Sequence, residues 1–165
     1  ETLVRVEGMD AQAVYRADRV AEALAAFGPA RRVEGEAQET LWRGIRDVHR
    51  FAGRAGAVWR LSLRPSDAPA AVAAIGAARP AEAVYDWGGG LVWLLTPEEG
   101  DAGAEAVRAE TRRLGGHATL VRAGPAIRSA VPVFEPQPAP LAAVARGLRA
   151  RFDPAGILNP GRMAP

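Results

Sequence analysis

The sequence predicts an α+β protein built on one sheet, and three observations support this fold class. Short apolar segments rich in valine, leucine and tryptophan alternate with stretches whose apolar residues recur every three to four positions. Glycine and proline stand at the ends of most of these segments, where they end helices and make turns. At 165 residues and 48% hydrophobic composition, the chain is long enough to bury a core.

The clearest order of elements lies between residues 57 and 122. Strands are predicted at residues 57–63, 83–87, 91–95 and 117–122, and helices at residues 66–78 and 102–114. The order strand, helix, strand, strand, helix, strand is that of a ferredoxin-like unit. We therefore expect an antiparallel or mixed sheet with helices mainly on one face.

Further elements are predicted on both sides of this unit. Strands at residues 2–7 and 30–34 and helices at residues 10–27 and 36–51 are expected to precede it. After it, three closely spaced prolines predict an extended strap, followed by a C-terminal helix over residues 140–152 and an ordered terminal turn. We divide the chain into a sheet-and-helix body, residues 1–123, and a strap, helix and docking turn, residues 124–165.

The composition disfavours several classes of function. All 21 basic residues are arginine, and 19 acidic residues nearly balance them, so no basic stripe for nucleic acid is expected. The chain has no cysteine, which excludes disulfides, thiolate metal ligands and cysteine nucleophiles. No apolar run is long enough to span a bilayer. We expect no direct membrane insertion and a cytoplasmic location.

The segment "WGGG", from Trp87 to Gly90, is a candidate binding feature. Bare backbone amides can cradle an anion, but the segment lacks phosphate-loop spacing and lies between two strands. A hairpin turn is therefore favoured. Trp87 and Trp93 could flank a planar ligand, although packing between neighbouring strands also explains them.

The remaining chemical groups do not form a recognisable catalytic pattern. His49 and His117 are the only histidines and lie far apart, so no metal site is predicted. Asp86 stands in an apolar strand and is a weak candidate for a functional carboxylate. Arg60 and Arg64 alternate with leucines on one strand face, where two guanidiniums could bind a carboxylate or be solvated. No catalytic residue is assigned.

The C-terminal run "RFDPAGILNPGRM" is the most specific feature of the sequence. Its prolines and glycines cannot continue a helix, and Asn159, Pro160 and Gly161 predict a rigid turn that directs Arg162 outward. The run resembles the C-terminal signature of FAD-linked oxidases of the vanillyl-alcohol oxidase type. Together with "YDWGGGLVWL", it is most similar to the FAD-binding subunits of bacterial glycolate oxidases.

This resemblance implies a cap domain that covers a flavin and takes part in the oxidation of glycolate to glyoxylate. FAD would be bound mainly by an N-terminal domain that precedes Glu1, so we expect the chain to be a fragment that is inactive alone. The residues that match the family's pattern, and are predicted to contact the cofactor, are Trp87, Gly88, Gly89, Asn159 and Arg162. The histidine-rich metal motif of the related 2-hydroxy-acid dehydrogenases is absent from the sequence.

The resemblance also implies partners. These would be a dehydrogenase-like flavin subunit and an iron–sulfur subunit of the same oxidase, through which the protein could lie at the inner membrane. One alternative of a different class stays open, namely a stand-alone ferredoxin-like module that binds a ligand or regulates another protein.

Overall fold

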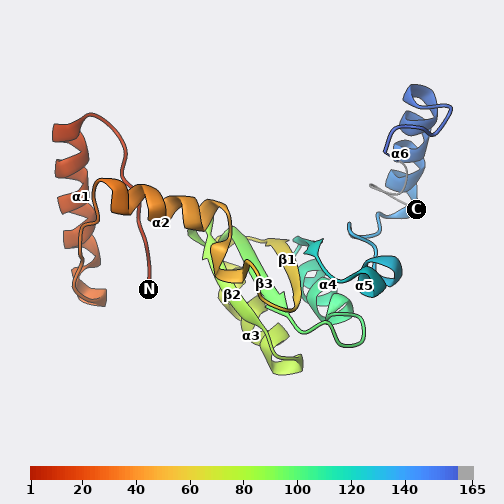
Figure 1. Ribbon diagram of the computed structural model, residues 1–165, viewed down its shortest axis with the longest axis horizontal. Helices are drawn as coiled ribbons and strands as arrows, with labels where there is room; N and C mark the ends of the chain where they lie inside the picture. The colour runs from red at the N-terminus through yellow and green to blue at the C-terminus, as the bar shows by residue number, and fades with distance from the viewer. Residues whose placement is uncertain (160–165) are drawn as a thin grey trace. The chain divides into compact units, whose positions relative to one another are not determined.

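The computed structural model describes residues 1–159 of the chain. It divides the chain into two compact units, Glu1–Asp47 and Val48–Pro165, which are considered separately below (Figure 1). The predicted α+β class is confirmed, and the single sheet lies in the second unit.

The first unit is helical. Its elements are α1 (Asp10–Leu24), the short 3-10 helix η1 (Ala25–Phe27) and α2 (Glu36–Arg46). Both predicted helices are confirmed, but the predicted strands at residues 2–7 and 30–34 are wrong, because neither segment pairs with a neighbouring strand within residues 1–159. Alternating apolar residues make a strand only where a neighbouring strand can accept the backbone hydrogen bonds.

The second helix ends earlier than the sequence predicts. The prediction extended it to residue 51, whereas α2 stops at Arg46 and Val48 adopts a left-handed conformation with φ of 51°. A separate 3-10 helix, η2 (His49–Phe51), follows, and its Phe51 is 1% exposed. This aromatic residue therefore belongs to the core of the second unit and not to the face of α2.

The second unit contains a four-stranded sheet. Its strands are β1 (Ala57–Ser62), β2 (Glu82–Asp86), β3 (Leu91–Thr96) and β4 (His117–Arg122), in the spatial order β2-β3-β1-β4. Every neighbouring pair of strands is antiparallel. β1 and β3 are central, so side chains on these two strands have neighbours on both sides.

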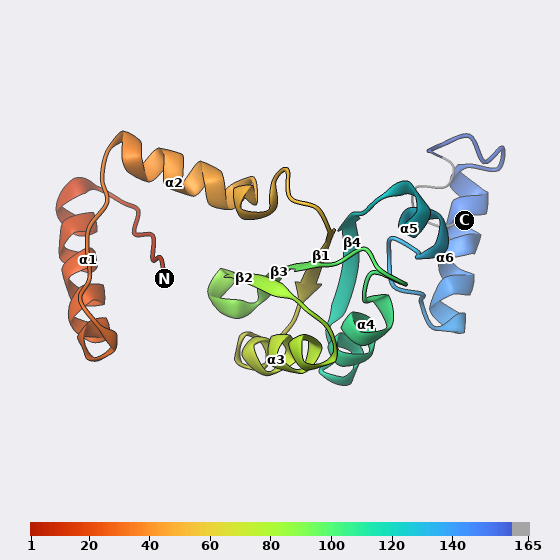
Figure 2. The same cartoon turned by 60° about the horizontal axis from the view of Figure 1, so that its bottom comes forward.

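Two helices cover one face of the sheet, α3 (Ala68–Ala78) and α4 (Ala104–Arg113), as Figure 2 shows. Each helix buries residues at positions i, i+3 and i+7, the spacing that forms one apolar stripe. These are Ala68, Ala71 and Ile75 on α3, and Ala104, Val107 and Thr111 on α4. The stripes pack on Trp59, Leu61, Val92, Leu94 and Leu120 from the sheet.

The opposite face of the sheet is covered only at one end. Phe51 packs there on Val58 and Leu95, with Trp93 partly buried beside them. Arg122 holds the covering segment in place, because its guanidinium donates to the carbonyl of Phe51 at 2.7 Å and to the next loop. The rest of this face carries mainly polar side chains, beside the buried Leu91.

After β4 the chain makes a short helix that the sequence analysis did not predict, α5 (Pro125–Ala130), begun by a proline at its first position. The following extended segment lies along the free edge of β4, where the Leu120 amide donates to the Val133 carbonyl at 2.9 Å. Arg108 and Arg112 of α4 bind the Pro132 carbonyl and Glu135, respectively. The predicted C-terminal helix is confirmed as α6 (Ala139–Phe152).

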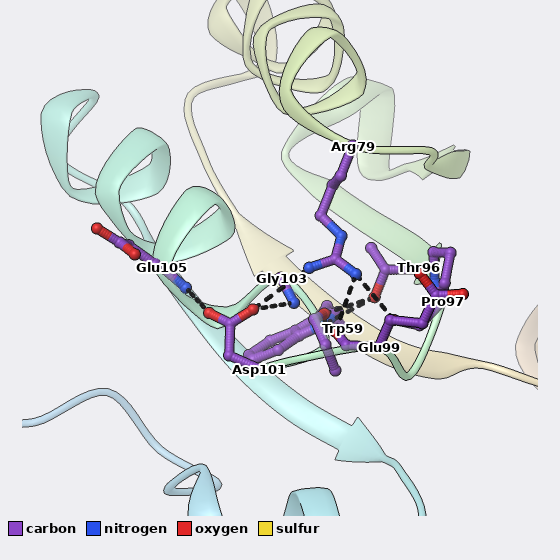
Figure 3. Close-up of polar contacts among 9 residues, drawn as sticks. Trp59, Arg79, Thr96, Pro97, Glu99, Asp101, Gly103 and Glu105 are labelled. Atoms are coloured by element: carbon purple, nitrogen blue, oxygen red, sulfur yellow. Dashed lines mark hydrogen bonds and ion pairs between the residues drawn. The ribbon is translucent and has the colours of Figure 1, made fainter.

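A polar network joins the end of β3 to the start of α4 (Figure 3). The buried indole of Trp59 donates to the Thr96 hydroxyl and the Ala102 carbonyl. At the surface of the same loop, Arg79 binds the Pro97 carbonyl at 3.0 Å and the Asp101 carboxylate at 3.3 Å. Asp101 also accepts the backbone N–H groups of Gly103 and Glu105.

Asp101 should make stability depend on acid pH. Partial burial raises the pKa of Asp101, but the two N–H donors and Arg79 outweigh burial, so the pKa lies below its usual value. The stabilisation is present above the unfolded pKa of about 4 and is lost as pH falls through the folded pKa. We expect Asp101→Ala to lower the free energy of unfolding by about 1 kcal/mol at pH 7, as for a lost helix cap.

The measurement is urea unfolding of wild type and Asp101→Ala at pH 7 and at pH 3. The difference between the two proteins should shrink at pH 3, because this pH lies below the unfolded pKa of about 4, where the stabilisation by the carboxylate begins to be lost. An equal difference at both pH values would show that the charge of Asp101 contributes nothing. Asp10 begins α1 without a side-chain cap and offers a matched control, Asp10→Ala.

Candidate functional site

The uncovered part of the sheet carries a group of polar side chains, which we call the polar sheet face. Paired residues in an antiparallel sheet project to the same side, and so do residues two apart on one strand. Arg60 pairs with Trp93 on β3 and with Thr119 on β4. One step along, Ser62 pairs with Leu91 and His117, and Leu91 pairs with Asp86. The polar sheet face therefore consists of Arg60, Ser62, Asp86, Trp93, His117 and Thr119.

Arg60 lies near the centre of this face and is half-buried on a central strand. Its guanidinium carbon lies 5.8 Å from the ring centroid of Trp87, which is within cation–π range. Arg60 and Arg64 do not share a strand face as the alternation suggested, because β1 ends at Ser62 and Arg64 binds Asp67 at 2.7 Å. The sequence pattern thus identified the arginine but not its neighbour.

Trp87 stands at the rim of the polar sheet face, in the turn η4 (Trp87–Gly89) that connects β2 to β3. Its amide donates to the Asp86 carboxylate at 2.7 Å, its φ is 51°, and its side chain is 68% exposed. The hairpin connection predicted for this segment is confirmed. Asp86 has a structural partner in this turn, which accounts for a carboxylate at the strand end.

The two glycines of the turn differ in their surroundings. Gly88 has φ of 62° and nothing within 4 Å of the position a Cβ would occupy. Gly89 is buried, and a Cβ there would lie 2.9 Å from the Pro65 carbonyl oxygen. Gly89 therefore allows the turn to pack closely on the loop after β1, whereas Gly88 leaves open space beside the exposed indole of Trp87.

Trp93 does not form an open pair with Trp87. It is partly buried and packs on the cluster of Phe51, Val58 and Leu95. Trp93 therefore packs between neighbouring strands, whereas Trp87 is accessible to a planar ligand. The histidines also separate, since His49 lies in η2 and the exposed His117 begins β4.

An ion-pair cluster borders the covered end of the same face. Arg50 and Arg54 both bind the Glu82 carboxylate, at 2.7 and 2.8 Å. Hydrogen bonds from these two arginines lower the pKa of Glu82, and the bond from Arg54 has the larger effect. Both guanidiniums are engaged by Glu82, and the cluster keeps a net charge of +1.

The terminal turn is only partly described. Asp153 accepts the backbone N–H groups of Ile157 and Leu158, and Asn159 is exposed with φ of 48°. Asparagine tolerates this left-handed conformation better than most residues. Arg162 lies outside the described residues.

Metal-binding clusters and membrane-spanning helices are both absent from residues 1–159. No group of three or more histidine, aspartate or glutamate side chains among them could hold a metal ion. No helix in this part of the chain is long and apolar enough to cross a bilayer.

Comparison with known proteins identifies one informative relative, the glycolate oxidase subunit GlcE of Escherichia coli strain K12. The two sequences are 36% identical over 124 residues, which is 74% of this chain and 31% of that subunit. This chain is similar to part of a glycolate oxidase subunit. The resemblance stated from the C-terminal run is thereby confirmed, although the chain spans only about a third of the length of GlcE. No protein-family model matches the chain.

Proposed function

We propose that this chain is the cap domain of an FAD-linked oxidase subunit that takes part in the oxidation of glycolate to glyoxylate. The similarity to GlcE carries this proposal, because it extends over 124 residues. Since the chain spans 31% of GlcE, the activity, substrate and partner subunits of the whole protein belong to the proposal. The partners would be a dehydrogenase-like flavin subunit and an iron–sulfur subunit.

In this proposal the accessible part of the β2–β3 turn contacts the flavin ring. The indole of Trp87 is two-thirds exposed, and Gly88 leaves the adjacent space open to a planar group. FAD, when bound, would accept the hydride from the substrate carbon that bears the hydroxyl group. The chain would contribute orientation, exclusion of water by the sheet, and the electrostatic field of Arg60.

The C-terminal run has a separate part in this proposal. Asn159 and Arg162 would contact the flavin domain or the cofactor, together with Trp87, Gly88 and Gly89. The apolar side chains of Phe152, Ile157 and Leu158 are 78%, 73% and 66% exposed. Such exposed apolar groups are typical of a surface that another domain covers.

The proposal is tested by the visible absorption spectrum of the complete gene product, purified with its partner subunits, before and after anaerobic addition of glycolate. We expect flavin bands that glycolate bleaches. Flavin bands that persist would contradict glycolate as the substrate. A product without flavin would contradict the whole proposal and favour a stand-alone ligand-binding module.

Trp87→Ala tests the position of the flavin in the same preparation. Contact between two aromatic rings contributes about 0.5–1.5 kcal/mol, so we expect flavin to be held about 2- to 10-fold more weakly. The measurement is flavin occupancy after dialysis. Tyr85→Ala is the matched control, because Tyr85 is 45% exposed and pairs with the core residue Val92, so it lies on the helix-covered face of the sheet and not on the face of Arg60. Equal flavin loss in both variants would contradict contact at Trp87.

A further inference from the structure

Arg60 differs from the other arginine of the sheet strands. Arg122 on β4 binds three backbone carbonyl groups of the loop over residues 51–56. The guanidinium of Arg60 makes no hydrogen bond or ion pair with any residue between 1 and 159, and its one cation–π contact within these residues is with the Trp87 ring. Its N–H donors therefore have no protein acceptor within residues 1–159 and are open to a ligand.

The surroundings fix Arg60 in place without neutralising it. Its side chain leaves β1 between Trp93 and Thr119 and reaches the ring of Trp87 beyond the end of β2. A guanidinium can contact an aromatic ring and still present its N–H donors to another group. The N–H donors at its edge therefore stay available for a ligand.

The chemistry of these donors selects a small planar anion. The two parallel N–H donors of a guanidinium match the two oxygens of a carboxylate, which gives a charge-assisted bidentate pair. Asp86 is the carboxylate on the same face, and one of its oxygens is held by the Trp87 amide at 2.7 Å. The half-buried hydroxyl groups of Ser62 and Thr119 lie on the same face as Arg60 and are compatible with a polar ligand.

We propose that Arg60 binds the carboxylate of the 2-hydroxy acid in the assembled oxidase, beside the flavin-facing Trp87. This inference rests on the proposed function and assigns the residue that recognises the acid group. It separates two tasks on adjacent elements: the turn η4 contacts the cofactor, and β1 supplies the charge that orients the substrate. A neutral alcohol of the same size would lack the group that Arg60 recognises.

The test replaces Arg60 by Gln in the complete protein with its partner subunits. We expect the KM for glycolate to rise about 10- to 100-fold, the effect of a lost hydrogen bond to a charged group, with a smaller change in kcat. Arg60→Lys keeps the charge but not the bidentate geometry and should recover part of the loss. Arg64→Gln is the control, because it removes an equal charge four residues away, where Asp67 already pairs with it.

A second readout does not depend on turnover. Oxalate is a planar anion of similar size, and its binding should raise the melting temperature of the wild-type complex. Arg60→Gln should lose this shift while Arg64→Gln keeps it, and flavin occupancy should be equal in all three proteins. This equality separates a misfolded variant from a variant that has lost only anion binding.

Two results would overturn the inference. A wild-type KM and oxalate shift in Arg60→Gln would show that Arg60 recognises no acid. Loss of flavin from Arg60→Gln, with an unchanged KM in the remaining loaded enzyme, would assign the arginine to an anionic group of the cofactor. If glycolate does not bleach the wild-type flavin, the proposed function fails first, and the oxalate shift then reports on Arg60 alone.

Discussion

Trp59→Ala should unfold the sheet unit far more easily than any surface change. Trp59 is 0% exposed at the centre of β1, so its removal leaves a cavity between the sheet and the two covering helices. Truncation of a buried tryptophan costs about 3–5 kcal/mol. Its indole also donates to the Thr96 hydroxyl at 3.2 Å and the Ala102 carbonyl at 3.1 Å, and these bonds are lost too. The measurement is urea unfolding followed by far-ultraviolet circular dichroism.

Trp59→Phe separates the volume of the ring from its polar group. Phenylalanine refills most of the cavity but leaves the Ala102 carbonyl with the Thr96 hydroxyl as its side-chain donor, at 2.7 Å. We expect a loss of about 0.5–1.5 kcal/mol, the net contribution of a typical hydrogen bond, because the Ala102 carbonyl keeps one donor. The ring of Trp59 also lies 5.3 Å from the guanidinium of the buried Arg108. An alanine variant as stable as the phenylalanine variant would contradict the packing role of the ring.

The sheet could be predicted from the sequence because its signals are local. Each of the four strands in the sheet was predicted to within one residue at each end, since Gly and Pro bound them and their apolar residues are dense. The strands expected at residues 2–7 and 30–34 failed because pairing is not local, and the structure gives these segments no partner strand. The helix at Pro125–Ala130 was missed because three prolines just after it favoured an extended strap.

The candidate site was less predictable than the fold. The exposed turn at Trp87 was expected, because three glycines between two strands indicate a tight connection. The lack of a hydrogen-bond partner for Arg60 within residues 1–159 was not expected. Alternation along β1 predicts on which side of the sheet the arginine lies, but not which other side chains reach it there. One signal was present in the sequence: an arginine between Trp59 and Leu61 must occupy the opposite face from a core tryptophan.

The turn between α4 and β4 connects the fold to the candidate site. A Cβ on Gly116 would lie 2.2 Å from the Ser62 carbonyl oxygen and 2.6 Å from a methyl group of Leu63. Backbone oxygens cannot move aside as flexible side chains do. Gly116→Ala must therefore displace the end of β1 from the start of β4, where Ser62 pairs with His117.

We expect Gly116→Ala to lower the free energy of unfolding by about 3 kcal/mol, the upper part of the range for overpacked sites. Gly115→Ala is the matched control, because its Cβ would meet nothing within 4 Å and only its φ of 72° opposes a side chain. That strain costs about 1–2 kcal/mol. Urea unfolding of both variants measures the difference, and equal losses would contradict the close approach at Gly116. Because Ser62 and His117 belong to the polar sheet face, Gly116→Ala should also weaken the oxalate shift that Gly115→Ala leaves intact.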